Sequence, residues 1–241
     1  MIKQVFILAA GEGKRMRPLT DNIPKPLVKV AGISMLDRIL KKINKIKSVE
    51  KIVINGYYLA EKVEYHVRKL KDKRIKFSRE FSKLETGGAL INALPFFDEN
   101  EPILIINGDI VWQDQDVLEK FIANFDEKKM DLFLGLKEKD QFLGYDGTGD
   151  FTLDKETKKL VKNVVNELVY VGIQIFHPRI LKDKKLPSVP FSLNYFFNNA
   201  EELKIKMNAM ILKGKIFHIG TTQALSKCDV IIDKWILDNI N

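Results

Sequence analysis

The chain has 241 residues, of which 45% are hydrophobic and 30% charged, a balance typical of a folded globular protein and not of a disordered one. The net charge is +8, but only seven of the 40 basic residues are Arg, so the composition does not favour a nucleic-acid reader, which relies on Arg. One Cys and three separated His exclude a multi-cysteine metal cluster and an HExxH zinc hydrolase.

The first half of the chain alternates short apolar runs with amphipathic stretches. The apolar run 5–10 (VFILAA) leads at once into a glycine-rich turn, so we expect a buried first strand and not a signal peptide. This alternation predicts an α/β fold, a mostly parallel sheet with helices on both faces and right-handed crossovers. The expected strands are 5–10, 51–55, 74–78, 102–107 and 130–136, and the expected helices are 34–46, 59–70, 87–94 and 116–125.

The second half has a different pattern. Residues 140–161 hold three glycines and two turn signals, which predict a β-hairpin excursion and hence a small β-rich substrate lobe. No apolar run approaches the roughly 18 residues of a membrane span, and a lone thiol suits a reducing compartment, so we expect a cytoplasmic protein. The other expected elements are strands at 168–176, 206–212 and 215–219 and helices at 192–203 and 222–240.

The segment AGEGKRMRPLTDNIPKPL (10–27), directly after the first strand, carries the most specific signal. Open α/β sheets bind ligands at the carboxyl ends of their strands. Gly11 and Gly13 allow close backbone approach, and successive amides in such a turn can bind an anion. The turn is therefore suited to a polyphosphate. Four cations flank it: Lys14, Arg15, Arg17 and Lys25.

Two familiar phosphate-binding motifs do not fit this turn. Met16 stands at the third glycine position of GxGxxG, which argues against a dinucleotide site, and the GxxxxGK[ST] of a P-loop is absent. An ordinary basic strand-to-helix loop would account for the two glycines alone. The spacing of the cations and the three prolines in the segment argue against that interpretation.

The string GEGKRMRPLTDNIPKPL resembles the signature of the sugar-1-phosphate nucleotidyltransferases, G-x-G-x-R-[ML]-x-P-L-T followed by P-K-P. The short form looks most like the N-acetylmuramate-1-phosphate uridylyltransferases and the short mannose-1-phosphate guanylyltransferases. The resemblance implies a Rossmann-like, doubly wound sheet of the nucleotide-diphospho-sugar transferase type. It also implies a single domain over 1–241, with a nucleotide-binding half at 1–136 and a sugar-binding half at 137–241. Further segments follow in family order: ETGGAL (85–90), INGD (106–109), GDFTLD (149–154), VGIQIF (171–176), FSLN (191–194) and IGTTQAL (219–225).

The resemblance also implies a reaction. A sugar 1-phosphate oxygen would attack the α-phosphorus of an NTP and release pyrophosphate, and the protein would mainly position two anions and neutralise their repulsion. UTP and N-acetylmuramate 1-phosphate are the expected substrates. The alternatives are GTP with mannose 1-phosphate, cytidylyl transfer to a small phosphomonoester such as phosphocholine, and a non-catalytic nucleotide-binding module. No nucleic acid or membrane partner is expected, and the oligomeric state is left open.

The family motif assigns roles to individual residues. Asp109 follows a buried strand and would hold Mg²⁺, whereas a capping or turn role suits Asp114 and Asp116 better. For Thr86, a helix N-cap is the structural alternative. The implied catalytic residues are Arg15, Lys25 and Asp109; the nucleotide-binding residues are Ala10, Gly11, Gly13, Glu85, Thr86, Gly87 and Gly88; and the substrate-binding residues are Asn107, Asp150, Gly172, Asn194 and His218.

Two of these positions keep alternatives open. His218 stands where many members of the wider family carry a second metal-binding Asp, and imidazole is a poor ligand for a hard cation. Either Asp109 and the phosphates suffice for Mg²⁺, or His218 contacts a substrate phosphate, or it is a core histidine. Gly172 lets a sugar ring approach its strand or marks a β-bulge. Weaker sugar-side candidates are Tyr145, Asp146, Asn166 and Glu167.

Overall fold

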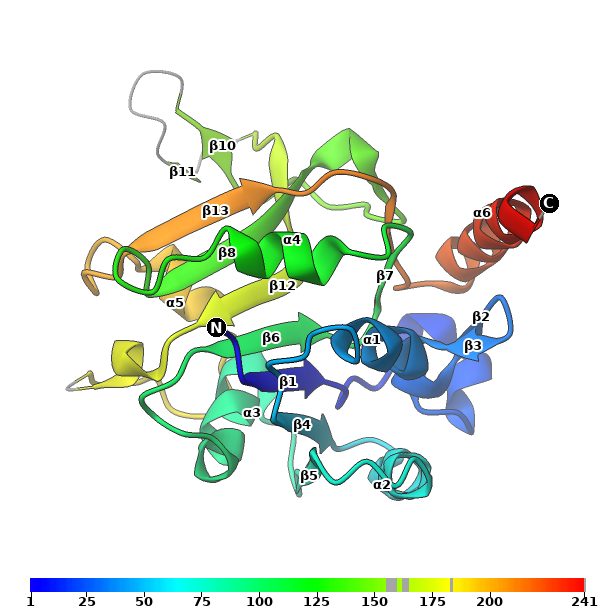
Figure 1. Ribbon diagram of the computed structural model, residues 1–241, viewed down its shortest axis with the longest axis horizontal. Coiled ribbons are helices and arrows are strands. Elements are labelled where there is room, and N and C mark those ends of the chain that lie inside the picture. Colours follow the sequence, from blue (N-terminus) through cyan, green and yellow to red (C-terminus); the bar gives the residue numbers. More distant parts are fainter. Residues whose placement is uncertain (155–159, 162–164, 183, 241) are drawn as a thin grey trace.

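A seven-stranded sheet forms the centre of the computed structural model, which describes residues 1–154, 160–161, 165–182 and 184–240. Its strands are β1 (Gln4–Leu8), β4 (Lys51–Gly56), β5 (Ile75–Arg79), β6 (Ile103–Asn107), β8 (Leu132–Glu138), β12 (Leu168–Phe176) and β13 (Met207–Ile211). The spatial order is β13-β8-β12-β6-β1-β4-β5, and every pair is parallel except those of β12, which runs antiparallel to β6 and β8 (Figure 1). The predicted mostly parallel α/β sheet is confirmed.

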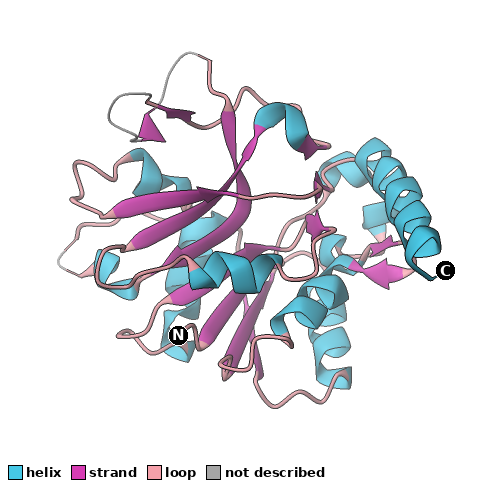
Figure 2. Ribbon diagram, turned by 45° about the horizontal axis from the view of Figure 1, so that its top comes forward, coloured by secondary structure: helices cyan, strands magenta, loops and turns pink. Residues whose placement is uncertain are grey.

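Helices cover both faces of this sheet, as Figure 2 shows. On one face lie α1 (Met35–Ile43), α2 (Ala60–Lys69) and α4 (Val117–Ala123), and on the other lie α3 (Glu85–Ala93) and α5 (Asn194–Asn198). In α1, Leu36, Ile39 and Ile43 follow helical spacing and bury one stripe against the sheet. Short 3-10 helices lie at Lys14–Met16, Leu19–Asp21, Lys25–Leu27, Leu94–Phe96, Lys139–Gln141 and Pro178–Leu181.

A third, smaller core lies beside the carboxyl end of β1. It is built by β7 (Ile110–Trp112), β9 (Phe142–Leu143), β14 (Ile216–His218), the antiparallel pair β2 (Lys29–Val30) and β3 (Ile33–Ser34), and α6 (Thr222–Ile240), which lies next to β2 and β3 in Figure 1. Met16 is fully buried there with Cys228 of α6. The residue that breaks the GxGxxG pattern thus anchors the basic loop in this core.

The structure differs from the sequence prediction in two places of the second half. The predicted hairpin at 140–161 is split: β9 joins β14 in parallel, and β10 (Thr152–Leu153) pairs antiparallel with β11 (Leu160–Val161). Residues 155–159 of that prediction lie outside the described residues. The predicted helix 192–203 is reduced to α5, because the chain leaves helical geometry after Asn198 and turns back at Lys204, which has φ 53°.

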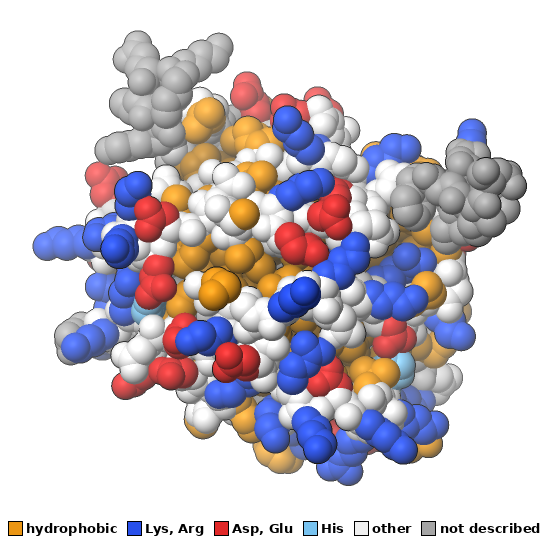
Figure 3. Space-filling view, in the orientation of Figure 1, with side chains coloured by type: hydrophobic (Ala, Val, Ile, Leu, Met, Phe, Trp, Pro, Cys, Tyr) orange, Lys and Arg blue, Asp and Glu red, His pale blue; other side chains and the backbone are white. Residues whose placement is uncertain are grey.

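The face of the molecule seen in Figure 3 carries many cations that are not gathered into one stripe. Lys and Arg side chains are scattered over the face seen in Figure 3, with Asp and Glu among them. On this face the arrangement agrees with solvated helix faces. In the part of the chain that the structure describes, no helix is long and apolar enough to cross a membrane.

Gly172 forms a bulge in β12, next to the end of β6. Its φ is 69°, and the pairing of β12 with β8 shifts register between Tyr170 and Gln174. A Cβ at Gly172 would lie 2.8 Å from Asn107 Cβ and 2.8 Å from Ile110 Cγ1. The bulge therefore brings the backbone of β12 against the end of β6, and a larger residue has no room there.

We expect Gly172→Ala to lower the free energy of unfolding by about 2–4 kcal/mol, because a left-handed backbone and overpacking both add cost. Urea denaturation measures this change. Gly32→Ala is the control: Gly32 has φ 75°, but no described heavy atom lies within 4 Å of its added Cβ. It should cost only about 1–2 kcal/mol. Equal losses in the two variants would contradict the role of the Asn107 contact.

Candidate active site

A cavity of about 380 Å³ opens at the carboxyl ends of β1, β4 and β6. Its size is in the range of small-molecule sites, roughly 300–1,000 Å³. It lies where an open α/β sheet is expected to bind a ligand. Three segments supply most of its wall: the loop after β1 from Leu8 to Lys14 with Lys25 and Pro26, the segment at Glu80 and 83–86, and Asn107–Asp109 at the end of β6.

The loop after β1 folds back on itself at Gly13. Gly13 has φ 65°, and a Cβ there would lie 2.9 Å from Thr20 Cγ2 and 3.2 Å from Lys25 Cβ. The Thr20 hydroxyl donates to the Gly13 carbonyl oxygen at 2.8 Å, and the Met16 N–H donates to the same oxygen at 2.8 Å. At Gly11, by contrast, no described heavy atom lies within 4 Å of an added Cβ. Gly13 thus brings Lys25 to the cavity, and Gly11 leaves space beside it.

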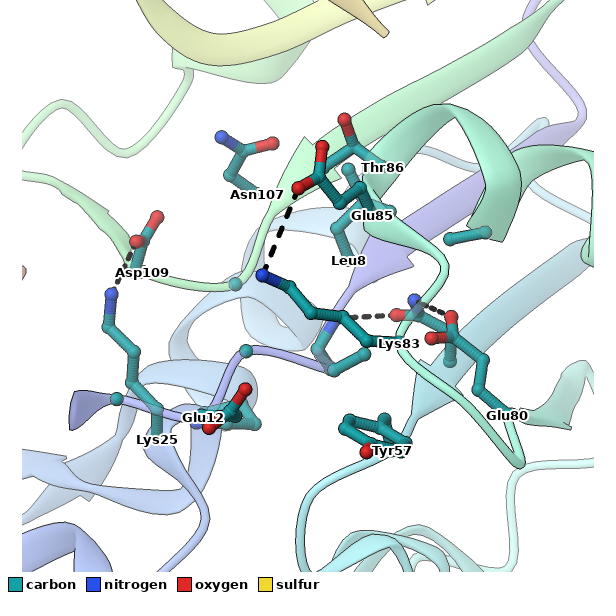
Figure 4. Close-up of a pocket in the computed structure, with 18 of the residues that line it drawn as sticks. Leu8, Glu12, Lys25, Tyr57, Glu80, Lys83, Glu85, Thr86, Asn107 and Asp109 are labelled. Atoms are coloured by element: carbon teal, nitrogen blue, oxygen red, sulfur yellow. Dashed lines mark hydrogen bonds and ion pairs between the residues drawn. The ribbon is translucent and has the colours of Figure 1, made fainter. Parts of the chain in front are cut away.

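Lys25 and Asp109 form an ion pair at the edge of the cavity, facing each other in Figure 4. Lys25 Nζ lies 2.5 Å from Asp109 Oδ2, and the side chains are 13% and 21% exposed. His218 Nε2 lies 3.4 Å from the same oxygen. Burial acts to raise the pKa of Asp109, but Lys25 and His218 outweigh burial and hold that pKa well below its usual range. Asp109 is therefore an ionised carboxylate held by two nitrogen groups.

Arg15 lies outside the wall of this cavity. Its guanidinium packs against Gly220, where an added Cβ would lie 2.8 Å from Nη2, and its Nη1 lies 3.8 Å from Asp146 Oδ2. The Arg15 side chain is 56% exposed. Of the three predicted catalytic residues, the structure therefore brings Lys25 and Asp109 together and places Arg15 beside them, next to the glycine-rich loop that holds Asp146.

A buried hydrogen-bonded chain forms the opposite wall. The Ala9 N–H donates to Asn55 Oδ1 at 2.6 Å, and Asn55 Nδ2 donates to Glu80 Oε1 at 2.6 Å. Glu80 is 6% exposed, and burial raises its pKa although the Asn55 bond acts against this. The sequence analysis missed both residues. A signal was present, because 51–55 (KIVIN) and 102–107 (PILIIN) are both buried strands that end in Asn.

The segment Glu85–Gly88 is divided between the cavity and the packing behind it. Glu85 and Thr86 line the cavity, and Lys83 Nζ lies 3.8 Å from Glu85 Oε1 (Figure 4). The N–H groups of Gly87 and Gly88 donate to the Phe191 carbonyl oxygen at 2.8 and 3.2 Å. These two amides therefore have a partner in the chain, and the nucleotide-binding role of Gly87 and Gly88 stays a prediction. Thr86 does not cap α3: its hydroxyl accepts from the backbone N–H at 193.

The remaining residues predicted to bind the nucleotide or the sugar fall into two groups. Ala10 and Asn107 line the cavity, and Gly172 packs directly behind Asn107. Asp150 and Asn194 lie apart from that wall: Asp150 accepts from the Tyr170 N–H at 2.8 Å, and the Asn194 N–H donates to a side-chain oxygen two residues earlier. The structure therefore gathers Asn107, Gly172 and His218 around the end of β6.

Tyr170 links the two groups. Its hydroxyl is buried and has no hydrogen-bond partner among the described residues, and burial with the charges of Asp109 and Asp150 raises its pKa. Sequence reasoning did not select Tyr170, because a Tyr in a buried strand normally indicates core packing. Tyr170 thus adds a buried polar group on which the charges of both Asp109 and Asp150 act.

The donors at the end of β6 fit a cation that is shared with a ligand. A carboxylate oxygen is a ligand that Mg²⁺ accepts, and Mg²⁺ is usually held by one or two carboxylates together with substrate phosphates and water. Among the described residues there is no group of three His, Cys, Asp or Glu side chains able to hold an ion alone. Asp109 is thus the group that would coordinate a phosphate-bound divalent cation.

Comparison with known proteins agrees with this site. The family model described as nucleotidyl transferase matches residues 4–185. The chain is 38% identical to an N-acetylmuramate α-1-phosphate uridylyltransferase of Caulobacter vibrioides, over 79% of this chain and 81% of that protein. It is 33% identical to the protein of the same name in Neisseria meningitidis, over 77% and 80%. The structure of the inositol-1-phosphate CTP transferase from T. maritima superposes with a TM-score of 0.78 at 17% identity, covering 97% and 96% of the two chains.

The Asn55–Glu80 bond gives a stability prediction. Asn55→Asp removes the donor and sets two carboxylates together, so we expect a loss of about 1–3 kcal/mol in the free energy of unfolding. Glu80→Gln in the same chain restores a donor and should recover at least about 1 kcal/mol of that loss in a double-mutant cycle.

The cost of Asn55→Asp should also shrink as the pH falls. Burial already raises the pKa of Glu80, so the two carboxylates come to share a proton as acid is added. Urea unfolding of the four proteins at several pH values measures both effects. If the losses in the free energy of unfolding of the two single variants simply add and do not depend on pH, the Asn55–Glu80 hydrogen bond is contradicted.

Proposed function

Since the chain belongs to the nucleotidyl transferase family, as one of its sugar-1-phosphate nucleotidyltransferases, we propose that it transfers a uridylyl group from UTP to N-acetylmuramate 1-phosphate in a Mg²⁺-dependent reaction. Pyrophosphate is the other product. The observation that carries this proposal is the Lys25–Asp109 pair, which lies at 2.5 Å beside the Gly11–Gly13 turn. The two uridylyltransferase relatives support the choice of UTP and of the acceptor.

The phosphate end of the substrates belongs at the Lys25 side of the cavity. The open space at Gly11 admits a triphosphate close to the backbone, where amides of the turn can donate to it. Lys25 then exchanges its contact with Asp109 for the reacting phosphates and offsets the repulsion between the two anions. When bound, Mg²⁺ supplies positive charge that stabilises the phosphoryl oxygens during transfer.

Arg15 completes the phosphate site after a movement of its side chain. It is 56% exposed and pairs with Asp146 at 3.8 Å, a contact that contributes little in water. A triphosphate is a stronger partner for its guanidinium, because charge-assisted bonds to phosphate are short and bidentate. We assign Arg15 to the departing pyrophosphate, as its position at the mouth of the turn supports.

The base belongs at the Glu80 side. Asn55 holds one carboxylate oxygen, so the second remains an acceptor at the cavity wall. Uracil offers its N3–H to such an acceptor, whereas cytosine presents a lone pair at N3 that the carboxylate repels. Guanine also offers an N–H, so GTP with mannose 1-phosphate is the second candidate. Cytidylyl transfer is disfavoured.

The sugar belongs near Asn107, the Gly172 bulge and His218. Asp150 and Asn194 lie farther from the cavity wall and are kept as outer sugar-side candidates. A non-catalytic module would bind nucleotide without turnover. We propose that the reaction takes place in the cytoplasm, with no nucleic acid or membrane partner.

Replacing Lys25 should slow catalysis strongly, and a urea melt separates this effect from the stability lost when Asp109 is left without its partner. We expect Lys25→Met to lower kcat by about 10²–10³, the usual effect of removing one preorganised charge. Pyrophosphate release from UTP, N-acetylmuramate 1-phosphate and Mg²⁺ measures this. Lys29→Met is the matched control, since Lys29 is exposed on β2 and should leave kcat unchanged. No pyrophosphate from the folded wild-type chain with any NTP and sugar 1-phosphate would overturn the proposal.

Glu80→Gln should change base selection. In this variant the Asn55 donor attracts the new amide oxygen and turns the new N–H₂ toward the base. We expect the preference for UTP over CTP, as a ratio of kcat/KM, to fall by about ten- to hundredfold, corresponding to one hydrogen-bonded base contact. An unchanged ratio would place the base elsewhere, while the Lys25 test would still decide on catalysis.

A further inference from the structure

Glu85 holds a backbone conformation that residues with a side chain rarely adopt. Its φ is 58°, in the left-handed region that favours glycine, and this conformation is strained for any other residue. Of the five non-glycine residues with positive φ in the part of the chain that the structure describes, Glu85 is the one that lines the cavity. The strain is therefore located at the site, and it points to a use for this side chain there.

The backbone on both sides of Glu85 is held by a segment that is distant in the sequence. The Leu84 carbonyl oxygen accepts from the Phe191 N–H at 3.2 Å, on one side of Glu85. The Thr86 hydroxyl accepts from the Leu193 N–H at 2.9 Å, on the other side. These bonds maintain the left-handed conformation of the residue between them, and the Glu85 side chain lies at the cavity wall.

The Glu85 carboxylate has a weak partner in Lys83. Lys83 Nζ lies 3.8 Å from Glu85 Oε1, and the two side chains are 62% and 43% exposed. An ion pair that is this open to water contributes little free energy. A ligand that donates hydrogen bonds to the carboxylate can therefore replace Lys83 as its partner at small cost.

Glu85 lies between the two ends of the cavity. In Figure 4 it stands between Glu80 at one end and Asp109 at the other. The proposed function puts the base at the Glu80 end and the phosphates at the Asp109 end, and a nucleotide has its ribose between the two. A carboxylate repels phosphates, whereas the two neighbouring hydroxyl groups of a ribose are neutral donors, one for each carboxylate oxygen.

We propose that Glu85 binds the ribose of the nucleotide through its 2′- and 3′-hydroxyl groups and so selects ribonucleotides. This rests on the proposed function, which fixes where the base and the phosphates lie. The two hydroxyl groups replace Lys83 as partners of the carboxylate, in charge-assisted hydrogen bonds that are stronger than neutral ones. The strained backbone serves to bring the carboxylate to the ribose, whichever base the nucleotide carries.

The ratio of kcat/KM for UTP to that for 2′,3′-dideoxy-UTP, measured by pyrophosphate release from the full chain, tests this selection. We expect a wild-type ratio of about ten or more, corresponding to hydrogen bonds to a charged acceptor. Glu85→Gly should bring the ratio close to one, and Glu85→Gln, whose amide oxygen still accepts, should lie between the two. The ratio for UTP to CTP should stay the same in both variants, because Glu80 is unchanged.

Lys71→Gly is the matched control. Lys71 has φ 53°, is exposed just after α2, and is not part of the cavity wall. Glycine relieves the strain of a left-handed backbone, so both glycine variants should unfold at a higher urea concentration than the wild-type chain. Lys71→Gly should keep the wild-type ratio of UTP to dideoxy-UTP. The same fall in both variants would attribute the change to the backbone and contradict the contact.

An unchanged ratio of UTP to dideoxy-UTP in folded Glu85→Gly would overturn the proposal. A fall confined to the ratio of UTP to CTP would also overturn it, since Glu85 would then contact the base. Turnover of both uridine nucleotides at the same rate by the wild-type chain would refute the ribose contact and leave the proposed function intact.

Thermal shifts with UTP and dideoxy-UTP separate the two hypotheses without an activity measurement. A chain that releases no pyrophosphate, yet is stabilised more by UTP than by dideoxy-UTP and loses this difference in Glu85→Gly, would refute the proposed function and keep the ribose contact. A folded chain that binds neither nucleotide would refute both.

Discussion

The contact between Lys25 and Asp109 is the constraint around which the site is built. Each residue comes from a different part of the fold: Lys25 from the long loop after β1, and Asp109 from the end of β6. Either charge left alone in this half-buried position would be costly, so the pair ties the loop to the sheet. The fold of the loop at Gly13 serves the same end, since it sets the Lys25 stem against the turn.

The two walls of the cavity differ in chemistry, and each suits a different part of a ligand. The wall around Asp109 is ionic, with Lys25 paired to the carboxylate and Arg15 beside the cavity. The wall around Glu80 is a fixed chain of short hydrogen bonds that begins at the backbone of β1. An ionic wall suits a polyphosphate, whereas a wall of fixed hydrogen-bonding groups suits a planar base. The cavity thus has a charged end at Asp109 and a hydrogen-bonding end at Glu80.

Much of this arrangement could be read from the sequence. The buried strands and amphipathic helices of the first half show clear periodicity of their apolar residues. The glycine turn and Asp109 each follow an apolar strand, so it was predictable that they meet at one edge of the sheet. The antiparallel direction of β12 was not, because an apolar run has no direction. The partner of a two-residue strand such as β9 is chosen by tertiary contacts.

The same limit applied to single side chains. The sequence does not indicate that Phe191 and Val189, from a distant segment, fill the space beside Gly87 and Gly88. Asn55 and Glu80 look ordinary until the fold joins them. Residue type indicates what a group can do, but the long-range neighbour decides whether it is available.

The burial of Met16 beneath α6 has a consequence for how the protein folds. The basic loop follows the first strand, but part of the core that holds it belongs to α6, which follows every strand of the sheet in the sequence. Strands β1, β4, β5 and β6 can pair early because they are neighbours in both sequence and space. The loop therefore has its complete buried anchor only once α6 has packed onto this core. Contacts far apart in the sequence thus set the shape of the loop.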